Sequence, residues 1–168
     1  ALLHQYDALS FWDYAAAAPY VSIDMNPVDS ACSKDAVFLS PHKFVGGPGT
    51  PGVLIVKKQL LKNSVPASPG GGTVLYVTPV DHQFITDHER REEGGTPAIV
   101  ESIRAGLVFK LQQAVGTDLI KSLEASFKER ALRRWKTNKN IEVLGDSSQQ
   151  GLSIFSLRIK HEEADLHY

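Results

Sequence analysis

The sequence predicts an α/β fold, and two observations support it. Short runs of β-forming residues, bounded by Pro, Gly or Asp, predict strands, and two long stretches with helical spacing of apolar residues lie between the fifth and sixth of these runs. Strands mixed with helices in this way are typical of α/β domains. The strands are expected at residues 9–12, 20–23, 36–39, 53–56, 73–78, 141–144 and 152–159.

The two helical stretches follow residue 96. Thr96 suits the N-cap of the first helix and Pro97 its first position. Gly116 is expected to end that helix, and Thr117 to cap a second helix that runs to about residue 136. A change in composition near Gly116 predicts two domains, residues 1–115 and residues 116–168. The apolar face of the first helix is expected to comprise Val100, Ile103, Leu107 and Leu111, with Val108 beside it.

Composition excludes several kinds of protein. The net charge of −1 over 168 residues carries no electrostatic signature of nucleic-acid binding, and no apolar run is long enough to span a bilayer. Cys32 stands alone, so no intrachain disulfide can form, which favours an intracellular, cytoplasmic location. No signal peptide is visible and no metal site is predicted. Both ends look cut, so we expect a piece of a longer protein.

Residues 38–52 hold the motif around which the chain is organised. A predicted strand ends in Ser40-Pro-His42-Lys43, and the glycine-rich run 46–52 follows. An amine at the end of a strand can act as a nucleophile or bind an anion. A surface hairpin with a solvated lysine is the simpler alternative. The run 46–52 resembles a phosphate loop in composition, but no Gly-Lys-Ser/Thr follows, so nucleotide binding is a minor alternative.

Three features combine into one predicted site. Asp13 follows the first strand, Ser40, His42 and Lys43 follow a later one, and Gly95-Thr96 opens the first helix. Strand ends in an α/β sheet gather at one crevice, where ligands bind. Pyridoxal 5'-phosphate needs an amine for its aldehyde, a carboxylate for its ring nitrogen and hydrogen-bond donors for its phosphate. The predicted set supplies all three.

These motifs together resemble a known family. Asp13, Ser40-x-His-Lys-x-x-Gly-Gly-Pro-Gly, the glycines at 70–72 and Glu93-Gly-Gly-Thr-Pro are similar to the class V aminotransferases. Within them the likeness is greatest to the cysteine desulfurase-like branch of fold-type I pyridoxal-phosphate enzymes, and it covers about residues 9–116. The resemblance implies part of a large mixed-sheet α/β/α domain, followed by the start of a small α+β C-terminal domain.

The resemblance also implies roles for single residues. Lys43 would form the internal aldimine, a Schiff base, and would later move the α-proton of an amino-acid substrate. Asp13 would pair with the pyridinium nitrogen. Ser40 and His42 would bind the cofactor phosphate.

The resemblance further implies a homodimer. Gly95 and Thr96 are similar to the segment that reaches across the dimer interface to the partner's phosphate. The helix that begins there would add backbone N–H groups that favour an anion.

Two positions depart from the desulfurase pattern. Ala16 stands where that branch usually has a glutamine that touches the cofactor's phenolic oxygen. Cys32 lies upstream of the lysine, does not match the persulfide-forming cysteine, and is interpreted as a structural or incidental thiol. A catalytically inactive relative that serves as a binding or scaffold module is therefore the alternative to an enzyme.

Overall fold

The computed structural model describes residues 1–145, 151–161 and 164–167. The chain divides into two compact units, residues 1–18 with 23–111, and residues 19–22 with 112–168. The domain boundary expected between residues 115 and 116 stays a prediction.

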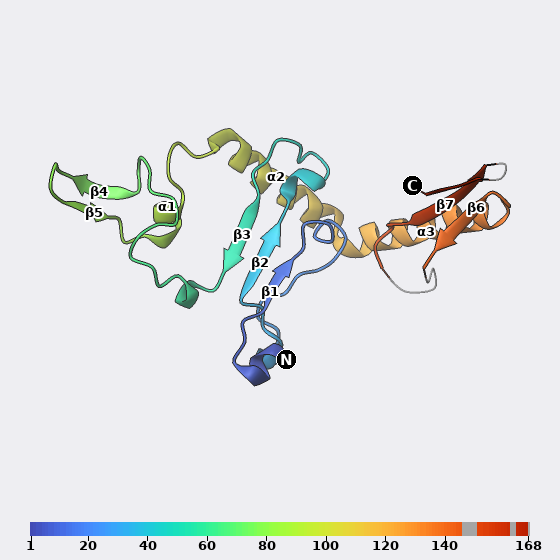
Figure 1. Ribbon diagram of the computed structural model, residues 1–168, viewed down its shortest axis with the longest axis horizontal. Coiled ribbons are helices and arrows are strands. Elements are labelled where there is room, and N and C mark those ends of the chain that lie inside the picture. The colour runs from blue at the N-terminus through green and yellow to red at the C-terminus, as the bar shows by residue number, and fades with distance from the viewer. Residues whose placement is uncertain (146–150, 162–163, 168) are drawn as a thin grey trace. The chain divides into compact units, whose positions relative to one another are not determined.

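A three-stranded mixed sheet forms the centre of the first unit (Figure 1). Strand β1 (Phe11–Asp13) runs parallel to β2 (Ala36–Leu39), and β3 (Val53–Val56) runs antiparallel to β2. The predicted bounds of β2 and β3 are confirmed, and β1 begins two residues later than predicted. The strand expected at residues 20–23 is wrong: the turn that Ala18 N–H closes onto the Tyr14 carbonyl (2.8 Å) continues through residue 20, with a bend at residue 21.

Short elements complete the first unit. Strands β4 (Val74–Val77) and β5 (His82–Phe84) form an antiparallel hairpin, where one strand was predicted at residues 73–78. The charged composition of residues 87–93 predicts an exposed segment, but within helix α1 (His88–Glu92) Arg91 is buried, because its guanidinium contacts the Asn63 carbonyl and His88. The 3-10 helices are η1 (Leu3–Tyr6), η2 (Ser30–Cys32), η3 (Pro41–Lys43) and η4 (Lys58–Leu60).

Helix α2 (Ile99–Val115) differs from its prediction in two ways. It begins two residues after Pro97, where Ser102 N–H donates to the Ala98 carbonyl (2.8 Å). Its buried residues are Ala105 and Val108, whereas the predicted apolar face is exposed. Apolar residues occur on several sides of this helix, so their spacing alone does not select the side that is covered. The exposed residues are Val100, Ile103, Leu107 and Leu111.

The second unit contains α3 (Thr117–Lys136) and an antiparallel sheet of β6 (Ile141–Leu144), β7 (Ser156–His161) and β8 (Ala164–His167). Gly116, at φ +85°, is the N-cap of α3, so Thr117 is its first residue and not its cap. Strand β6 has its predicted bounds, β7 begins four residues late, and the turn expected at residues 146–151 lies outside the described residues except for residue 151. Within the described ranges, no helix is long and apolar enough to cross a membrane.

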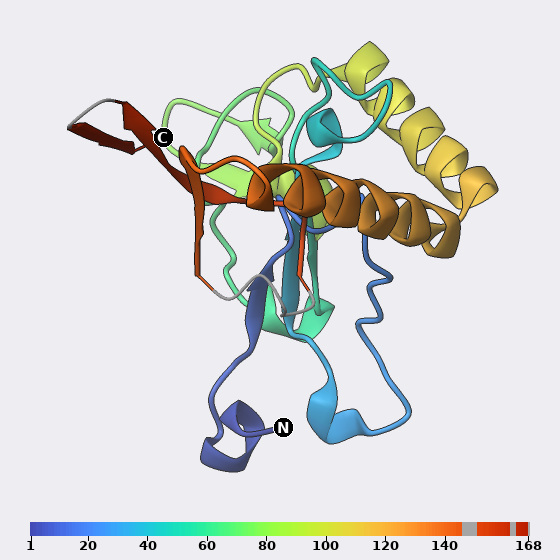
Figure 2. The same cartoon turned by 90° about the vertical axis from the view of Figure 1, so that its right-hand side faces the viewer.

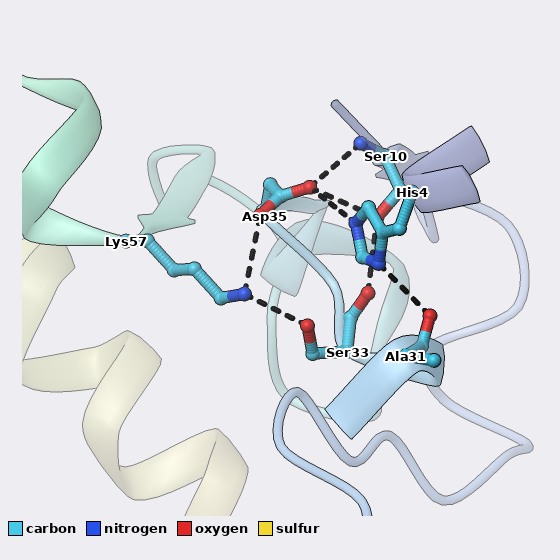
Figure 3. A network of polar contacts seen from close by, with 6 residues as sticks. All are labelled: His4, Ser10, Ala31, Ser33, Asp35 and Lys57. Carbon is cyan, nitrogen blue, oxygen red and sulfur yellow. Dashed lines mark hydrogen bonds and ion pairs between the residues drawn. The ribbon is translucent and has the colours of Figure 1, made fainter. Parts of the chain in front are cut away.

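A buried polar network lies at the end of the first sheet where β1 and β2 begin (Figures 1 and 3). The Asp35 carboxylate accepts hydrogen bonds from Ser10 N–H (2.8 Å) and His4 Nε2 (2.9 Å), and lies 3.1 Å from Lys57 Nζ. Because His4 Nδ1 faces the Ala31 carbonyl at 2.8 Å, both ring nitrogens must carry a proton for both bonds to form. The network ties the starts of β1 and β2 to the end of β3.

Asp35→Asn should lower the free energy of unfolding by about 3 kcal/mol at neutral pH, since it leaves the Lys57 ammonium beside a neutral amide. The Ser10 N–H, followed by His4 and Lys57, holds the pKa of the Asp35 carboxyl well below its usual range. A depressed pKa stabilises the fold above the pKa of the unfolded chain and loses that contribution as the pH falls below about 4. Denaturant unfolding at a series of pH values should therefore show a smaller acid dependence in Asp35→Asn. Asp7→Asn, an exposed control, should keep the native acid dependence, and an unchanged profile in Asp35→Asn would contradict the role of the network.

Candidate active site

The lysine turn, defined as Ser40–Lys43, follows β2 directly. Ser40 is the N-cap of η3, and its hydroxyl makes no capping hydrogen bond. Pro41 is buried at the first position of η3, and Lys43 N–H donates to the Ser40 carbonyl at 3.0 Å. The side chains of His42 and Lys43 are exposed. A buried proline and a closed backbone turn thus present an imidazole and an amine to the outside.

Asp13 lies beside this turn because β1 and β2 are parallel. Asp13 is in register with Phe38, and the next residue, Tyr14, donates its N–H to the Phe38 carbonyl at 2.9 Å. The exposed Asp13 carboxylate accepts the Ala15 N–H at 2.7 Å through one oxygen, which fixes its direction. The structure therefore places Asp13 and Ser40 at the carboxyl ends of neighbouring strands, as predicted. This edge lies opposite the Asp35 network (Figures 1 and 2).

The glycine loop, residues 46–50, packs against the lysine turn from behind. A Cβ atom on Gly47 would lie 1.9 Å from the Pro41 carbonyl oxygen, so only glycine fits there. Gly47 N–H donates to the Phe44 carbonyl (2.9 Å), and the buried Thr50 hydroxyl donates to the Gly47 carbonyl (2.7 Å). The glycine loop is therefore closed by its own hydrogen bonds and packs against the lysine turn.

Helix α2 contacts the same region through its buried side. Phe44, directly after Lys43, packs with Ala18 and Val108 in the core of the first unit. Its ring also meets Phe109 edge to face, with centroids 5.4 Å apart. The residue after the lysine is thus anchored while the lysine side chain stays exposed.

Gly95 and Thr96 lie between α1 and α2. Gly95, at φ +89°, donates its N–H to the Gly71 carbonyl at 2.8 Å, and Thr96 is exposed. Among the residues that the structure describes, no hydrogen bond joins this segment to the lysine turn. The structure therefore places Asp13 and the lysine turn at neighbouring strand ends, and it connects Gly95 to the segment before β4.

Sequence reasoning missed Arg104 as a residue of this region. Arg104 Nη1 donates to the Pro48 carbonyl at 2.8 Å, across 56 residues of chain. No motif around Arg104 in the sequence indicates a partner, and only the fold shows the contact. The glycine content of residues 46–52 predicted the loop. It did not show which of these glycines has no room for a side chain.

Comparison with family models identifies the chain. The model of the aminotransferase class-V family matches residues 1–167. The chain belongs to this family. Among its relatives, a probable cysteine desulfurase of Staphylococcus epidermidis is 28% identical over 155 residues, which cover 92% of this chain and 35% of the relative. One from Staphylococcus aureus is also 28% identical, over 94% of this chain and 37% of the relative.

Solved structures agree on the fold of this class V family member. A cysteine desulfurase of Escherichia coli, in an S-sulfonic acid form, has a TM-score of 0.78 at 21% identity, covering 93% of this chain and 37% of that one. The apo cysteine desulfurase of Thermococcus onnurineus has a TM-score of 0.73 at 20% identity, covering 96% and 38%. The predicted fold-type I class is confirmed. The chain spans just over a third of the length of these relatives.

Proposed function

We propose that this chain is part of a pyridoxal-phosphate-dependent enzyme that acts on an amino acid, either as a cysteine desulfurase or as another class V aminotransferase-type enzyme. The observation that carries the proposal is the edge where β1 and β2 end, which holds the carboxylate of Asp13 and the exposed amine of Lys43. Family membership and the names of the relatives support the same reaction class.

The residues at this edge fit pyridoxal phosphate by their chemistry. An amine suits the aldehyde, a carboxylate suits the ring nitrogen, and a hydroxyl and an imidazole suit the phosphate. Lys43, Asp13, Ser40 and His42 supply these groups from two adjacent strand ends. The Ser40 hydroxyl makes no bond within η3, so it can donate to a ligand without breaking a cap.

Each residue then has a defined task. The cofactor, when bound, supplies an electron-accepting ring that stabilises negative charge at the substrate α-carbon. Lys43 Nζ would hold the cofactor aldehyde, and its amine, when free, would remove and return the proton at that carbon. The Asp13 carboxylate holds a proton on the ring nitrogen by charge pairing. Ser40 Oγ and a ring N–H of His42 donate to the phosphate.

Gly95 and Thr96 enter the proposal through a dimer. Their similarity to the family segment that crosses the dimer interface supports binding to the phosphate of a second copy of the chain. The N–H groups at the start of α2, three residues after Thr96, favour an anion there. A homodimer with shared phosphate contacts is the assembly we propose.

Ala16 favours one alternative, a catalytically inactive relative that serves as a binding or scaffold module. Ala16 is exposed three residues after Asp13, and a methyl group there can neither donate nor accept a hydrogen bond. Such a protein would hold the cofactor without reacting with amino acids.

The proposal is tested with the complete protein and added pyridoxal phosphate. Amino acids, cysteine first, are screened for a change in cofactor absorbance and for products. Sulfide with alanine would indicate desulfuration, and a keto acid would indicate amino-group transfer. Stable cofactor binding with no spectral change for any amino acid would favour the inactive relative, and no binding would contradict both.

Asp13→Asn should weaken cofactor binding by about 10- to 100-fold, the effect of losing one charge-assisted hydrogen bond. The amide keeps the side chain's size and can still accept the Ala15 N–H. Asp24→Asn is a matched control, because exposed Asp24 accepts the Asn26 N–H at 2.9 Å in the same way, away from the site. Titration of the apo protein followed by fluorescence measures both. Equal affinities of the two variants for pyridoxal phosphate would show that Asp13 does not bind the cofactor.

A further inference from the structure

Arg104 links α2 to the loop behind the lysine turn. Its Nη1 donates to the Pro48 carbonyl at 2.8 Å and would lie 3.4 Å from a Cβ atom on Gly49. Among the described residues no carboxylate forms an ion pair with this guanidinium, so Pro48 is its observed polar partner. The contact is between two segments that no other side-chain hydrogen bond joins in the described part of the first unit.

The glycine loop connects the Arg104 contact to the lysine turn, because it packs directly against that turn. Pro48 directly follows Gly47, whose backbone packs against the Pro41 carbonyl with no room for a side chain. On the other side, Thr50 N–H and its hydroxyl both donate to the Gly47 carbonyl, at 3.0 and 2.7 Å. A displacement of Pro48 would therefore move Gly47 and, through it, the backbone that presents Lys43.

Helix α2 contacts the glycine loop at a second position. One helical turn after Arg104, Val108 packs against Phe44 and lies 3.8 Å from a Cβ position on Gly46. Val108 makes apolar contacts with Phe44 and with the start of the glycine loop. Apolar contact is non-directional, so it does not fix the orientation of the loop backbone. A hydrogen bond is directional, so the bond from Arg104 fixes the orientation of the Pro48 carbonyl, which the contact with Val108 does not.

We propose that Arg104 is a positioning residue for Lys43: by holding the Pro48 carbonyl it fixes residues 46–50 against the turn that presents the amine. This inference rests on the proposed function, in which Lys43 attaches the cofactor. Arg104 itself acts through the loop and touches no reacting atom.

The first test uses the complete protein without cofactor. Amide hydrogen exchange at Gly47 and Thr50 should become about threefold to tenfold faster in Arg104→Ala, because one surface hydrogen bond holds the loop closed. Arg104→Met, which keeps the aliphatic stem, should behave like Arg104→Ala and serves if the alanine variant does not fold. Arg104→Lys keeps a donor and should stay near the native rates. Lys110→Ala, an exposed cation on the same helix, is the matched control and should change nothing.

The second test measures how Lys43 reacts. The rate at which pyridoxal phosphate attaches to Lys43, trapped by borohydride and mapped across a pH series, should fall at least about threefold in Arg104→Ala with a displaced pH profile. A purely structural role would lower thermal stability but leave this profile unchanged.

The outcomes separate the two claims. Native attachment at Lys43 with an equal rate and profile in Arg104→Ala would overturn the positioning role alone. Unchanged amide exchange in Arg104→Ala would overturn it as well. No attachment at Lys43 in the native protein would overturn the proposed function and this inference with it, whereas attachment slowed in Arg104→Ala but not in Lys110→Ala supports both.

Discussion

Lys43→Ala should lower amino-acid turnover by the complete protein at least about 100-fold. The substitution removes both the amine that attaches the cofactor and the base that moves the substrate proton, and proton transfer by a positioned side chain alone contributes about 100- to 10,000-fold. The Lys43 side chain is exposed, so its removal leaves no cavity and should leave the fold intact. Turnover under saturating cofactor, with circular dichroism of the same sample, measures the effect.

Two variants make the Lys43 result specific. Lys43→Arg keeps a positive charge but offers a guanidinium that stays protonated, so it should be as inactive as Lys43→Ala. Lys62→Ala removes another exposed lysine of the first unit and should retain native turnover. If Lys43→Arg kept substantial activity, the residue would serve only as a cation, and covalent attachment would be wrong.

Gly47→Ala should lower the free energy of unfolding by about 1–3 kcal/mol, the usual cost of forcing an extra methyl group into a packed site. Its Cβ atom would lie 1.9 Å from the Pro41 carbonyl oxygen, and backbone cannot move aside as a flexible side chain does. The same displacement would shift Lys43, so covalent attachment of the cofactor should slow as well. Denaturant unfolding and attachment rates should be measured on the same protein.

Gly52→Ala is the matched control for Gly47→Ala, since it lies in the same glycine-rich run. Its Cβ atom would meet the Leu39 carbonyl oxygen at 3.8 Å, an ordinary contact, so stability and attachment should stay near native. Similar losses in both variants would show that the run needs backbone freedom in general. In that case the close contact at Pro41 would not be the reason for the glycine.

The first sheet could be read from the sequence because its signals are local. The bounds of β2 and β3 follow from β-forming runs between turn residues, and the lysine turn follows β2 directly. That Asp13 lies beside Ser40 required only the rule that parallel strands end at one edge. These predictions depend only on residues that are close together in the sequence.

The failed expectations depend on tertiary contacts. Arg91 is buried because the distant Asn63 carbonyl accepts its guanidinium, and nothing near Arg91 in sequence reveals this. The buried side of α2 is selected by Phe44, 64 residues before Val108, and not by the helix's own spacing. Arg104 was missed for the same reason. The phosphate role of Gly95 and Thr96 stays a prediction; within one copy of the chain the Gly95 N–H donates to the Gly71 carbonyl.

The most direct measurement of the central claim is borohydride reduction of the complete protein with pyridoxal phosphate, followed by peptide mapping. A single stable label on Lys43 is the predicted result, because its exposed amine lies beside the Asp13 edge on a turn fixed from behind. A label on another lysine, or no label at all, would contradict the assignment of this edge as the cofactor site.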